Sequence, residues 1–155
     1  ESCFMTSKAN SKTEDTMPDS RENNTLSIDP IEFLAGVERV WRAHDGVTAA
    51  AAYTDDAVVY YGENLTHTGE KLRAWPTRWF EYTKDLDIRK TYRGHAGDCI
   101  VGTWESNYTS PETGKKVYER GAELFFVRGD MVYEHHMWQH SWAEGDIHND
   151  KGFAT

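Results

Sequence analysis

Apolar residues recur at helical spacing through SIDPIEFLAGVERVWRAHDG, residues 27–46. Asp29 suits the N-cap of a helix, Pro30 suits its first position, and Glu32 stands where a capping box has its acid. We therefore predict a helix that starts at Pro30 and ends at Gly46. One face of this helix collects its apolar side chains and one histidine: Phe33, Leu34, Val37, Val40, Trp41 and His44.

A strand and two further helices are predicted before residue 86. The run VTAAAAYTDD, residues 47–56, favours a short helix, and AVVYYG, residues 57–62, has the β-branched and aromatic residues of a strand. A third helix is predicted from Gly69 to about Asp85. Pro76 lacks the N–H that bonds to the preceding turn, so we expect a kink or a break there. One side of this helix collects Leu72, Trp75, Trp79 and Tyr82.

The pattern then changes to the alternation that is typical of strands. Four strand-like runs cover residues 86–94, 98–109, 115–127 and 131–142. The turn sequences SPETGKK and RGD separate the second run from the third and the third from the fourth. Helices followed by a meander of long antiparallel strands predict an α+β fold, in one domain over residues 28–143.

The two ends of the chain lack this patterning. Residues 1–27 are polar, rich in Ser, Thr and Asn, and too poor in apolar side chains to fold alone, so we interpret them as a flexible arm. Residues 144–155 are interpreted as a C-terminal tail. A partner subunit is a candidate for holding the arm, in keeping with a homodimer.

Composition narrows the classes of partner. A formal net charge of −9 without a Lys/Arg cluster argues against nucleic-acid binding. No run approaches the ~18 consecutive apolar residues of a membrane helix. Six Trp, eight Tyr and six Phe residues provide flat side chains that would line a cavity for an apolar or aromatic small molecule.

Cysteines and sequons leave the compartment open. Cys3 and Cys99 form neither a metal-binding spacing nor a disulfide framework. Three glycosylation sequons, at Asn23, Asn64 and Asn107, matter only if the chain is secreted. The chain as given shows no signal peptide, so a cytoplasmic location is slightly favoured and secretion stays open.

Three stretches carry a family resemblance. AAYTDDAVVYYGENLTHTGEKLRAW resembles a segment in which a short helix meets a DDAVV strand and then a helix. DCIVGTWESNYTSPETGKKV and ERGAELFFVRGDMVYEHHMW resemble two long strands and a closing strand. Together they resemble the SnoaL-like family of the nuclear transport factor 2-like superfamily, over about residues 29–142.

The resemblance implies a cone-shaped α+β barrel, in which three N-terminal helices pack on a curved, mostly antiparallel sheet. It implies a pocket inside the cone and, in many members, dimers formed through the outer face of the sheet. Enzymes of this superfamily include cofactor-free polyketide cyclases, dehydratases, isomerases and epoxide hydrolases. Other members only bind, so the resemblance does not identify a reaction.

The last predicted strand contains YEHHMWQHSW, residues 133–142, whose side chains alternate between two faces. The resemblance places the acid or base of the family on the concave face, nearest His136. We therefore predict that one set of side chains faces the cavity: Glu134, His136, Trp138 and His140. The other set, His135, Met137 and Gln139, would face outward and offer material for a dimer. A β-bulge would invert this assignment beyond it.

The histidines of this strand do not suit one metal ion. His136 and His140 lie four strand residues apart, about 13 Å at ~3.3 Å per residue. Zinc ligands lie ~2.1 Å from the metal, so these two cannot share one while the strand is regular. We expect no metal site; if one existed, Glu134 or Glu123 with His136 would be its core.

The neighbouring strands offer further cavity residues. The resemblance puts Glu119 and Glu123 nearer the cavity, where Glu123 would orient His136. The alternative for Glu123 is an ion pair with Arg120 or Lys116 at the rim. Ser106 and Tyr61 would hold a substrate oxygen. Flat walls and further contacts would come from Trp104, Trp138, Tyr108, Trp79 and His140, although core packing alone would also explain the aromatic residues.

Two functions follow as hypotheses. In the first, the protein binds a small molecule and, as an enzyme, moves protons by isomerisation, dehydration, cyclisation or epoxide opening. His136 would be the general acid or base, supported by Glu123 or Glu134 and by Tyr61. In the second, the protein is a non-catalytic ligand-binding or assembly module that dimerises through the outer sheet face. The chain contains no P-loop, G-x-G-x-x-G or G-x-S-x-G motif, so we expect no cofactor.

Overall fold

The first helix begins where the sequence predicts. The computed structural model describes residues 25–62 and 65–146, so most of the predicted arm and tail lie outside the described residues. In α1, Pro30–Arg42, the Asp29 side chain accepts hydrogen bonds from two backbone N–H groups of the first turn, which have no partner inside the helix. Glu32 does not complete a capping box, because its carboxylate pairs with Arg39 at 2.6 Å.

All three helices end earlier than predicted. α1 ends at Arg42 rather than at Gly46, because His44 adopts a left-handed conformation with φ 54°. α2, Gly46–Ala51, is shorter than predicted, since the strand already begins at Tyr53. α3, Gly69–Tyr82, continues through Pro76, so the predicted break is not found. None of the helices in the described ranges is long and apolar enough to cross a membrane.

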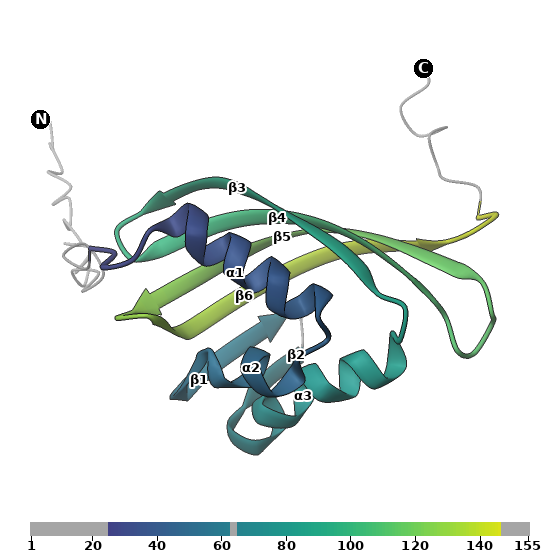
Figure 1. Cartoon of the computed structure of the whole chain (residues 1–155), viewed down its shortest axis with the longest axis horizontal. Coiled ribbons are helices and arrows are strands. Elements are labelled where there is room, and N and C mark those ends of the chain that lie inside the picture. The colour runs from purple at the N-terminus through teal and green to yellow at the C-terminus, as the bar shows by residue number, and fades with distance from the viewer. Residues whose placement is uncertain (1–24, 63–64, 147–155) are drawn as a thin grey trace, which may run out of the picture.

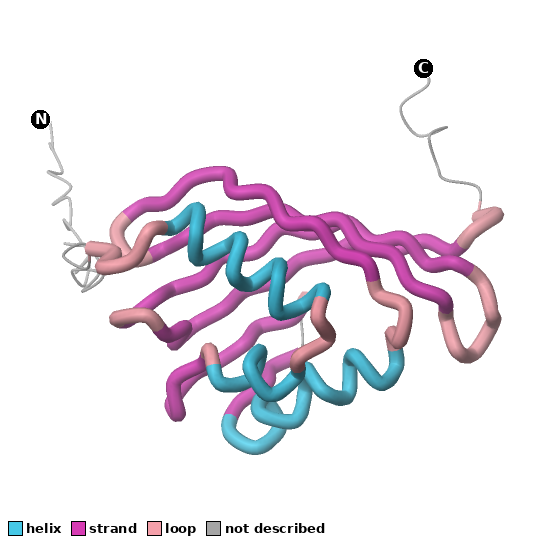
Figure 2. Tube along the Cα trace, in the orientation of Figure 1, coloured by secondary structure: helices cyan, strands magenta, loops and turns pink. Residues whose placement is uncertain are grey.

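Six strands form one curved sheet, and all three helices lie on one side of it (Figures 1 and 2). The strands are β1 Tyr53–Tyr61, β2 Leu65–Thr68, β3 Asp87–Ala96, β4 Cys99–Thr109, β5 Lys116–Arg128 and β6 Met131–Ala143. Their order is β2-β1-β6-β5-β4-β3, and only the β1–β6 pair is parallel. The predicted α+β fold, with three helices on a curved and mostly antiparallel sheet, is confirmed.

The core lies between the helices and the concave face of this sheet. Its buried apolar side chains include Leu34 of α1, Val59 of β1, Ile100 of β4 and Phe125 of β5. Because these residues alternate with exposed ones along each strand, the alternation read from the sequence describes the sheet well, except in β6.

A β-bulge interrupts the pairing of β6 with β5. Phe126 pairs with Glu134, whereas the next residue, Val127, pairs with Val132, so Tyr133 is an extra residue in β6. A bulge of one residue shifts every later side chain to the opposite face of the sheet. The alternation expected from the turn at Gly129 is therefore inverted beyond Tyr133.

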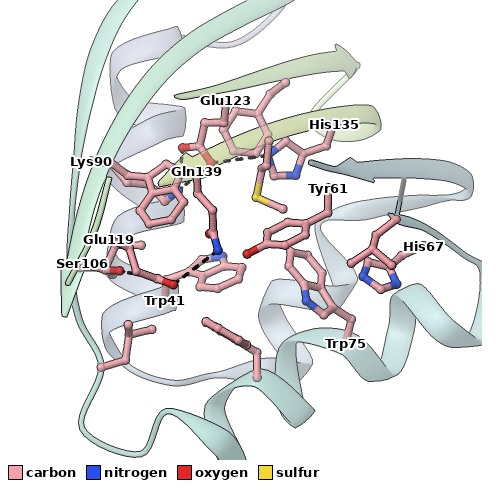
Figure 3. Close-up of a pocket in the computed structure, with 17 residues that line it drawn as sticks. Trp41, Tyr61, His67, Trp75, Lys90, Ser106, Glu119, Glu123, His135 and Gln139 are labelled. Atoms are coloured by element: carbon pink, nitrogen blue, oxygen red, sulfur yellow. Dashed lines mark hydrogen bonds and ion pairs between the residues drawn. The ribbon is translucent and has the colours of Figure 1, made fainter. Parts of the chain in front are cut away.

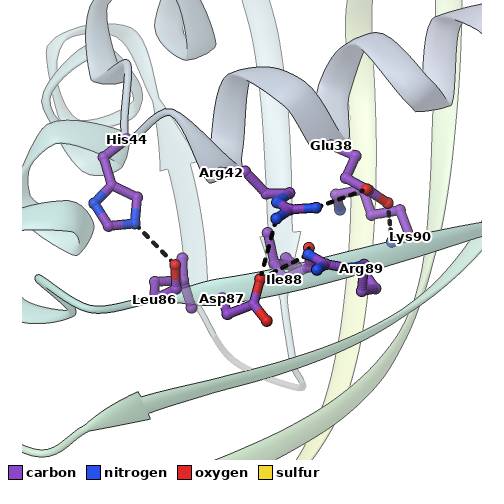
Figure 4. Close-up of polar contacts among 8 residues, drawn as sticks. All are labelled: Glu38, Arg42, His44, Leu86, Asp87, Ile88, Arg89 and Lys90. Carbon is purple, nitrogen blue, oxygen red and sulfur yellow. Dashed lines mark hydrogen bonds and ion pairs between the residues drawn. The ribbon is translucent and has the colours of Figure 1, made fainter.

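Polar side chains of the first helix region hold the edge strand β3 in place (Figure 4). The Glu38 carboxylate accepts a hydrogen bond from the backbone N–H of Lys90 at 2.6 Å. His44 Nε2 donates to the Leu86 carbonyl at 3.0 Å. An edge strand has backbone groups without a partner strand, and these two bonds give partners to one N–H of β3 and to the carbonyl just before it. They also fix the position of Lys90 on the sheet.

We expect Gly46→Ala to destabilise the fold. A Cβ atom at Gly46 would lie 2.8 Å from Thr77 Cα and 2.9 Å from Thr77 N, so α2 and α3 would have to move apart. Such overpacking costs about 1–3 kcal/mol of unfolding free energy, measurable by urea denaturation. Gly36→Ala is the matched control, because the nearest atom to its Cβ is Arg39 Nη2 at 3.7 Å. A Gly46→Ala protein as stable as the control would contradict this packing.

Candidate functional site

A cavity of about 230 Å³ opens between the helices and the concave face of the sheet (Figure 3). This is room for a small molecule, since a water molecule takes ~30 Å³. The lining residues, mostly apolar and aromatic, are Trp41, Tyr61, Leu65, His67, Trp75, Trp79, Leu86, Ile88, Lys90, Trp104, Ser106, Glu119, Glu123, Phe125, His135, Met137 and Gln139.

Five of the predicted site residues lie in this cavity: Tyr61, Trp79, Trp104, Ser106 and Glu123. They come from β1, α3, β4 and β5, on the faces that the alternation predicted. Tyr108 is buried beside the cavity rather than in its lining; its ring packs edge-on against Trp79, with centroids 5.7 Å apart.

The prediction that the even-numbered residues of the last strand face the cavity is wrong. His136, Trp138, His140 and Glu134 lie on the convex face, and the Trp138 residue is 47% exposed. The predicted outward set lines the cavity instead, at His135, Met137 and Gln139. The reason is the bulge at Tyr133, which inverts the two faces of β6.

On the convex face, His136 still has a carboxylate partner. Its Nε2 lies 2.7 Å from Glu134 Oε1, and its ring stacks on Tyr60 with centroids 4.5 Å apart. Glu123 does not orient His136, because the two residues lie on opposite faces of the sheet. The imidazole beside Glu123 is that of His135.

One end of the cavity holds a buried chain of four polar groups. Lys90 Nζ lies 2.6 Å from Oε1 and 2.8 Å from Oε2 of Glu123. Glu123 Oε2 lies 3.4 Å from His135 Nε2, and His135 Nδ1 lies 2.8 Å from the Tyr53 hydroxyl. Glu123 pairs with Lys90 inside the cavity. The alternative ion pair of Glu123 with Arg120 or Lys116 at the rim therefore does not form.

Burial and charge together set the protonation of this chain. Burial opposes ionisation of Glu123, but the positive charge of Lys90 and the contact with His135 outweigh it and hold the pKa of Glu123 below its usual value. Burial lowers the pKa of His135, and Glu123 offsets this only in part. His135 is therefore neutral near pH 7.

A single arrangement of protons suits a neutral His135. The Tyr53 hydroxyl donates to Nδ1, and Nε2 carries the ring proton and directs it toward Glu123. The reverse tautomer would leave a lone pair facing a carboxylate. Tyr53 stays a neutral donor because burial, with the nearby charge of Glu123, raises the pKa of its phenol.

A second carboxyl group lies at the other end of the cavity. Glu119 is 4% exposed and accepts a hydrogen bond from the Ser106 hydroxyl at 2.8 Å. Gln139 Nε2 approaches its other oxygen at 3.5 Å. Burial raises the pKa of Glu119, and the Ser106 hydrogen bond only partly opposes that rise. Burial and the charge of Glu119 also raise the pKa of the Tyr61 hydroxyl.

The Trp104 indole separates the two carboxyl groups. Glu119 and Glu123 lie four residues apart on one face of β5, about 13 Å at ~3.3 Å per residue. Gly121 lies between them, and a Cβ atom at this position would collide with the Trp104 ring. The glycine therefore lets the indole lie flat against the sheet as the floor of the cavity.

Within the described ranges, three buried side-chain nitrogens have no hydrogen-bond partner, and all three belong to cavity residues: His67 Nδ1, Trp104 Nε1 and His135 Nε2. His135 Nε2 faces Glu123 at 3.4 Å, so it is His67 Nδ1 and Trp104 Nε1 that indicate a site for a polar ligand group in this cavity, because buried polar groups are normally paired. No group of three or more His, Cys, Asp or Glu residues in the same ranges could hold a metal ion.

A larger groove of about 480 Å³ lies on the other side of Trp41 and Phe125, between α1 and α2. Three of its four charged side chains are engaged in the fold: Asp29 caps α1, and Glu32 pairs with Arg39. The smaller cavity is therefore the better candidate for chemistry.

Sequence reasoning missed Lys90 and the roles of Glu119 and His135. Glu119 had a signal, since it shares a face with Glu123. Lys90 had none, because its partner is 33 residues away on a strand that is not its neighbour.

Comparison with known proteins identifies one domain type. The family model described as SnoaL-like domain matches residues 34–135. None of the curated proteins matches the chain significantly.

Several solved structures share the fold. A protein of ketosteroid isomerase-like fold from Catenulispora acidiphila, in complex with trimethylamine, is 16% identical with a TM-score of 0.62 over 69% of this chain and 84% of that chain. The epoxide hydrolase/cyclase-like enzyme SalBIII, of salinomycin pyran ring formation, is 12% identical with a TM-score of 0.65 over 74% and 95%. An NTF2-like protein from Burkholderia thailandensis is 16% identical with a TM-score of 0.62 over 73% and 92%.

We expect Lys90→Met to destabilise the protein strongly. The change leaves the buried Glu123 carboxylate without its cation, which costs about 3–5 kcal/mol of unfolding free energy. The double variant Lys90→Met/Glu123→Met should recover most of this loss, because no buried charge is left.

Urea denaturation measures both variants against a control. Lys116→Met removes a surface ion pair with Asp85, at 2.9 Å, and should cost no more than about 1 kcal/mol. If Lys90→Met were as mild as Lys116→Met, Glu123 would not carry a buried charge.

Proposed function

The chain belongs to the SnoaL-like family, and from this premise we propose that it binds a small apolar or aromatic molecule and transfers a proton with it, without a cofactor. The observation that carries the proposal is Glu119, a carboxyl group buried in an apolar cavity with a pKa above its usual value. A general base works best when its pKa lies near the working pH, and burial moves Glu119 in that direction.

Glu119 takes the role first predicted for His136. His136 lies outside the cavity, and both nitrogens of His135 already face protein groups, so neither is placed to meet a ligand. Glu123 is neutralised by Lys90. In the part of the chain that the structure describes, the partners of Glu119 are the neutral Ser106 and Gln139, so Glu119 stays able to exchange a proton with a bound molecule.

The other cavity groups support this chemistry. Ser106 orients the Glu119 carboxylate, and the Tyr61 hydroxyl, kept neutral by its raised pKa, can donate to a ligand oxygen. Trp41, Trp75 and Trp79 supply flat walls that exclude water. A proton taken by Glu119 at one carbon or oxygen and returned at another is an isomerisation. In a dehydration, Glu119 would take a proton from the carbon beside the C–OH carbon while that C–O bond breaks, and would return the proton to the hydroxide, which leaves as water. In an epoxide opening, Glu119 would take the proton of a hydroxyl group whose oxygen bonds to the epoxide carbon, and the proton would go to the oxygen of the C–O bond that breaks. The similarity to SalBIII and to a ketosteroid isomerase-like fold is in keeping with such reactions.

We expect the protein to catalyse the ring opening of 5-nitrobenzisoxazole, a general probe for a buried base. Glu119 would take the C3 proton while the N–O bond breaks, giving a cyano-nitrophenolate that is followed by its absorbance. Glu119→Gln should lower kcat/KM by about 10²-fold or more. Glu105→Gln is the matched control, because Glu105 lies on the convex face and pairs with Arg120 at 3.2 Å. Equal losses in both variants would rule out Glu119 as the base.

The pH dependence gives a separate test of Glu119. Only its ionised form accepts a proton, so kcat/KM should rise with pH through a midpoint above the ordinary 4.5 of a glutamate. Ser106→Ala removes the hydrogen bond that lowers this pKa and should move the midpoint higher still. A midpoint that does not respond to Ser106→Ala would indicate another base.

A second function, assembly, is favoured by the convex face. An aromatic stripe runs along it, made of Tyr60, His136, Trp138, Trp142 and Tyr118, and three of these residues are exposed. His136 stacks on Trp138 with centroids 5.8 Å apart. Exposed aromatic patches of this kind mark interaction sites, so we propose that two copies pair through the stripe. The interface residues are those of the even-numbered set of β6, not the set predicted from the sequence.

We expect Trp138→Glu to convert a dimer into a monomer of 17.8 kDa, measured by light scattering after size exclusion. A charge placed in the centre of an apolar interface is left without a partner in the complex. Val47→Glu is the control, because Val47 is 79% exposed on α2, away from the sheet. If the unmodified protein is already a monomer, the assembly proposal is wrong.

A further inference from the structure

The Trp104 indole N–H is a buried donor without an acceptor. Trp104 is 6% exposed and lines the cavity, and its Nε1 has no hydrogen-bond partner in the part of the chain that the structure describes. An indole nitrogen can only donate. A bound molecule that satisfies it must therefore present an acceptor, in practice an oxygen.

A second donor comes from the neighbouring strand, β3. Lys90 and Trp104 are directly paired across β3 and β4, which places their Cβ atoms ~4.5–5.5 Å apart. The Lys90 side chain is 5% exposed and carries three N–H donors, of which Glu123 oxygens engage two. Around the ammonium lie the ring faces of Trp41 and Phe125, both 5.8 Å away, which accept no conventional hydrogen bond. Within residues 25–62 and 65–146 the ammonium makes no third hydrogen bond, and Lys90 lines the cavity, so this donor can serve a ligand.

Charge decides what kind of oxygen fits. Lys90 and Glu123 form a neutral pair, so a carboxylate or phosphate would bring an unbalanced charge into an apolar enclosure. A carbonyl or phenol oxygen accepts the same hydrogen bonds without that cost. The indole floor and the tryptophan walls favour a flat molecule around this oxygen.

We propose that the cavity recognises an uncharged, planar cyclic molecule by its oxygen, which accepts hydrogen bonds from Trp104 Nε1–H and Lys90 Nζ. This inference rests on the proposed function and adds the chemical class of its ligand. The donors would also draw electrons from a carbonyl, so that a C–H near Glu119 becomes easier to deprotonate.

Two probes of one skeleton test the inference. 1-Indanone carries a carbonyl oxygen, and indane lacks it. Isothermal titration of the unmodified protein should give a Kd for 1-indanone about tenfold lower than that for indane. The six tryptophan indole N–H signals of the ¹⁵N-labelled protein give a second readout. Trp104→Phe identifies the Trp104 signal by its loss, and that signal should move downfield with 1-indanone but not with indane.

The variants separate a donor from a packing residue. Trp104→Phe should reduce the preference for 1-indanone over indane, since Lys90 is left as the single donor, whereas Trp79→Phe, which alters another wall, should preserve it. Equal affinity for both probes, with no downfield shift, would overturn this inference and leave the proposed function standing. Binding of neither probe up to its solubility limit would overturn both. The affinity comparison needs no variant, so it holds even if Trp104→Phe does not fold.

Discussion

The ion pair between Lys90 and Glu123 is the interaction on which the cavity depends. Taking two charges out of water costs several kcal/mol for each ion, and the pair offsets this only with good geometry and further contacts. The structure supplies both: two short contacts to the Glu123 oxygens, an imidazole behind them, and two aromatic faces around the ammonium. Glu38 fixes the backbone of Lys90 from α1, so a helix and three strands converge on one polar group.

The same strand shows how partners decide the state of a carboxyl group. Glu123 and Glu119 lie on one face of β5, and both are buried. Glu123 has a cation, and its pKa falls; Glu119 has a hydroxyl and an amide, and its pKa rises. Glu123 is a fixed charge that orders its surroundings, whereas Glu119 loses its proton at a higher pH than an ordinary glutamate. Paired acids with opposite shifts are a common basis for acid–base chemistry.

The sequence predicted most of the fold because its local signals were strong. Helical spacing and the Asp29 cap located α1, and alternation located the four long strands within a few residues. β2 escaped notice, since LTHT is too short for a pattern and largely exposed. The parallel pairing of β1 with β6 was also missed, because it joins segments far apart in the chain with no local signal.

The site was less predictable than the fold, because the face on which a strand residue lies depends on the number of residues between it and the preceding turn. Alternation sorted the side chains of β4 and β5 into two faces, and the family resemblance assigned Glu123, Trp104 and Ser106 to the cavity, where they lie, as β4 and β5 pair without a shift. In β6 a single residue, Tyr133, changed the outcome, and no glycine or proline in β6 marked it. The buried Lys90 was equally hidden, since an inward lysine is explained only by a partner two strands away.

The bulge at Tyr133 also decides which side chains of β6 belong to the cavity and which belong to the convex face. Beyond it, His135, Met137 and Gln139 belong to the cavity, and His136, Trp138 and His140 belong to the convex face. Loss of one residue at this point would exchange the two sets, burying Trp138 and turning His135 away from Glu123. The cavity and the aromatic stripe use opposite faces of β1, β5 and β6, so a side-chain change on one face can leave the other face intact, whereas a shift in the register of β6 would alter both.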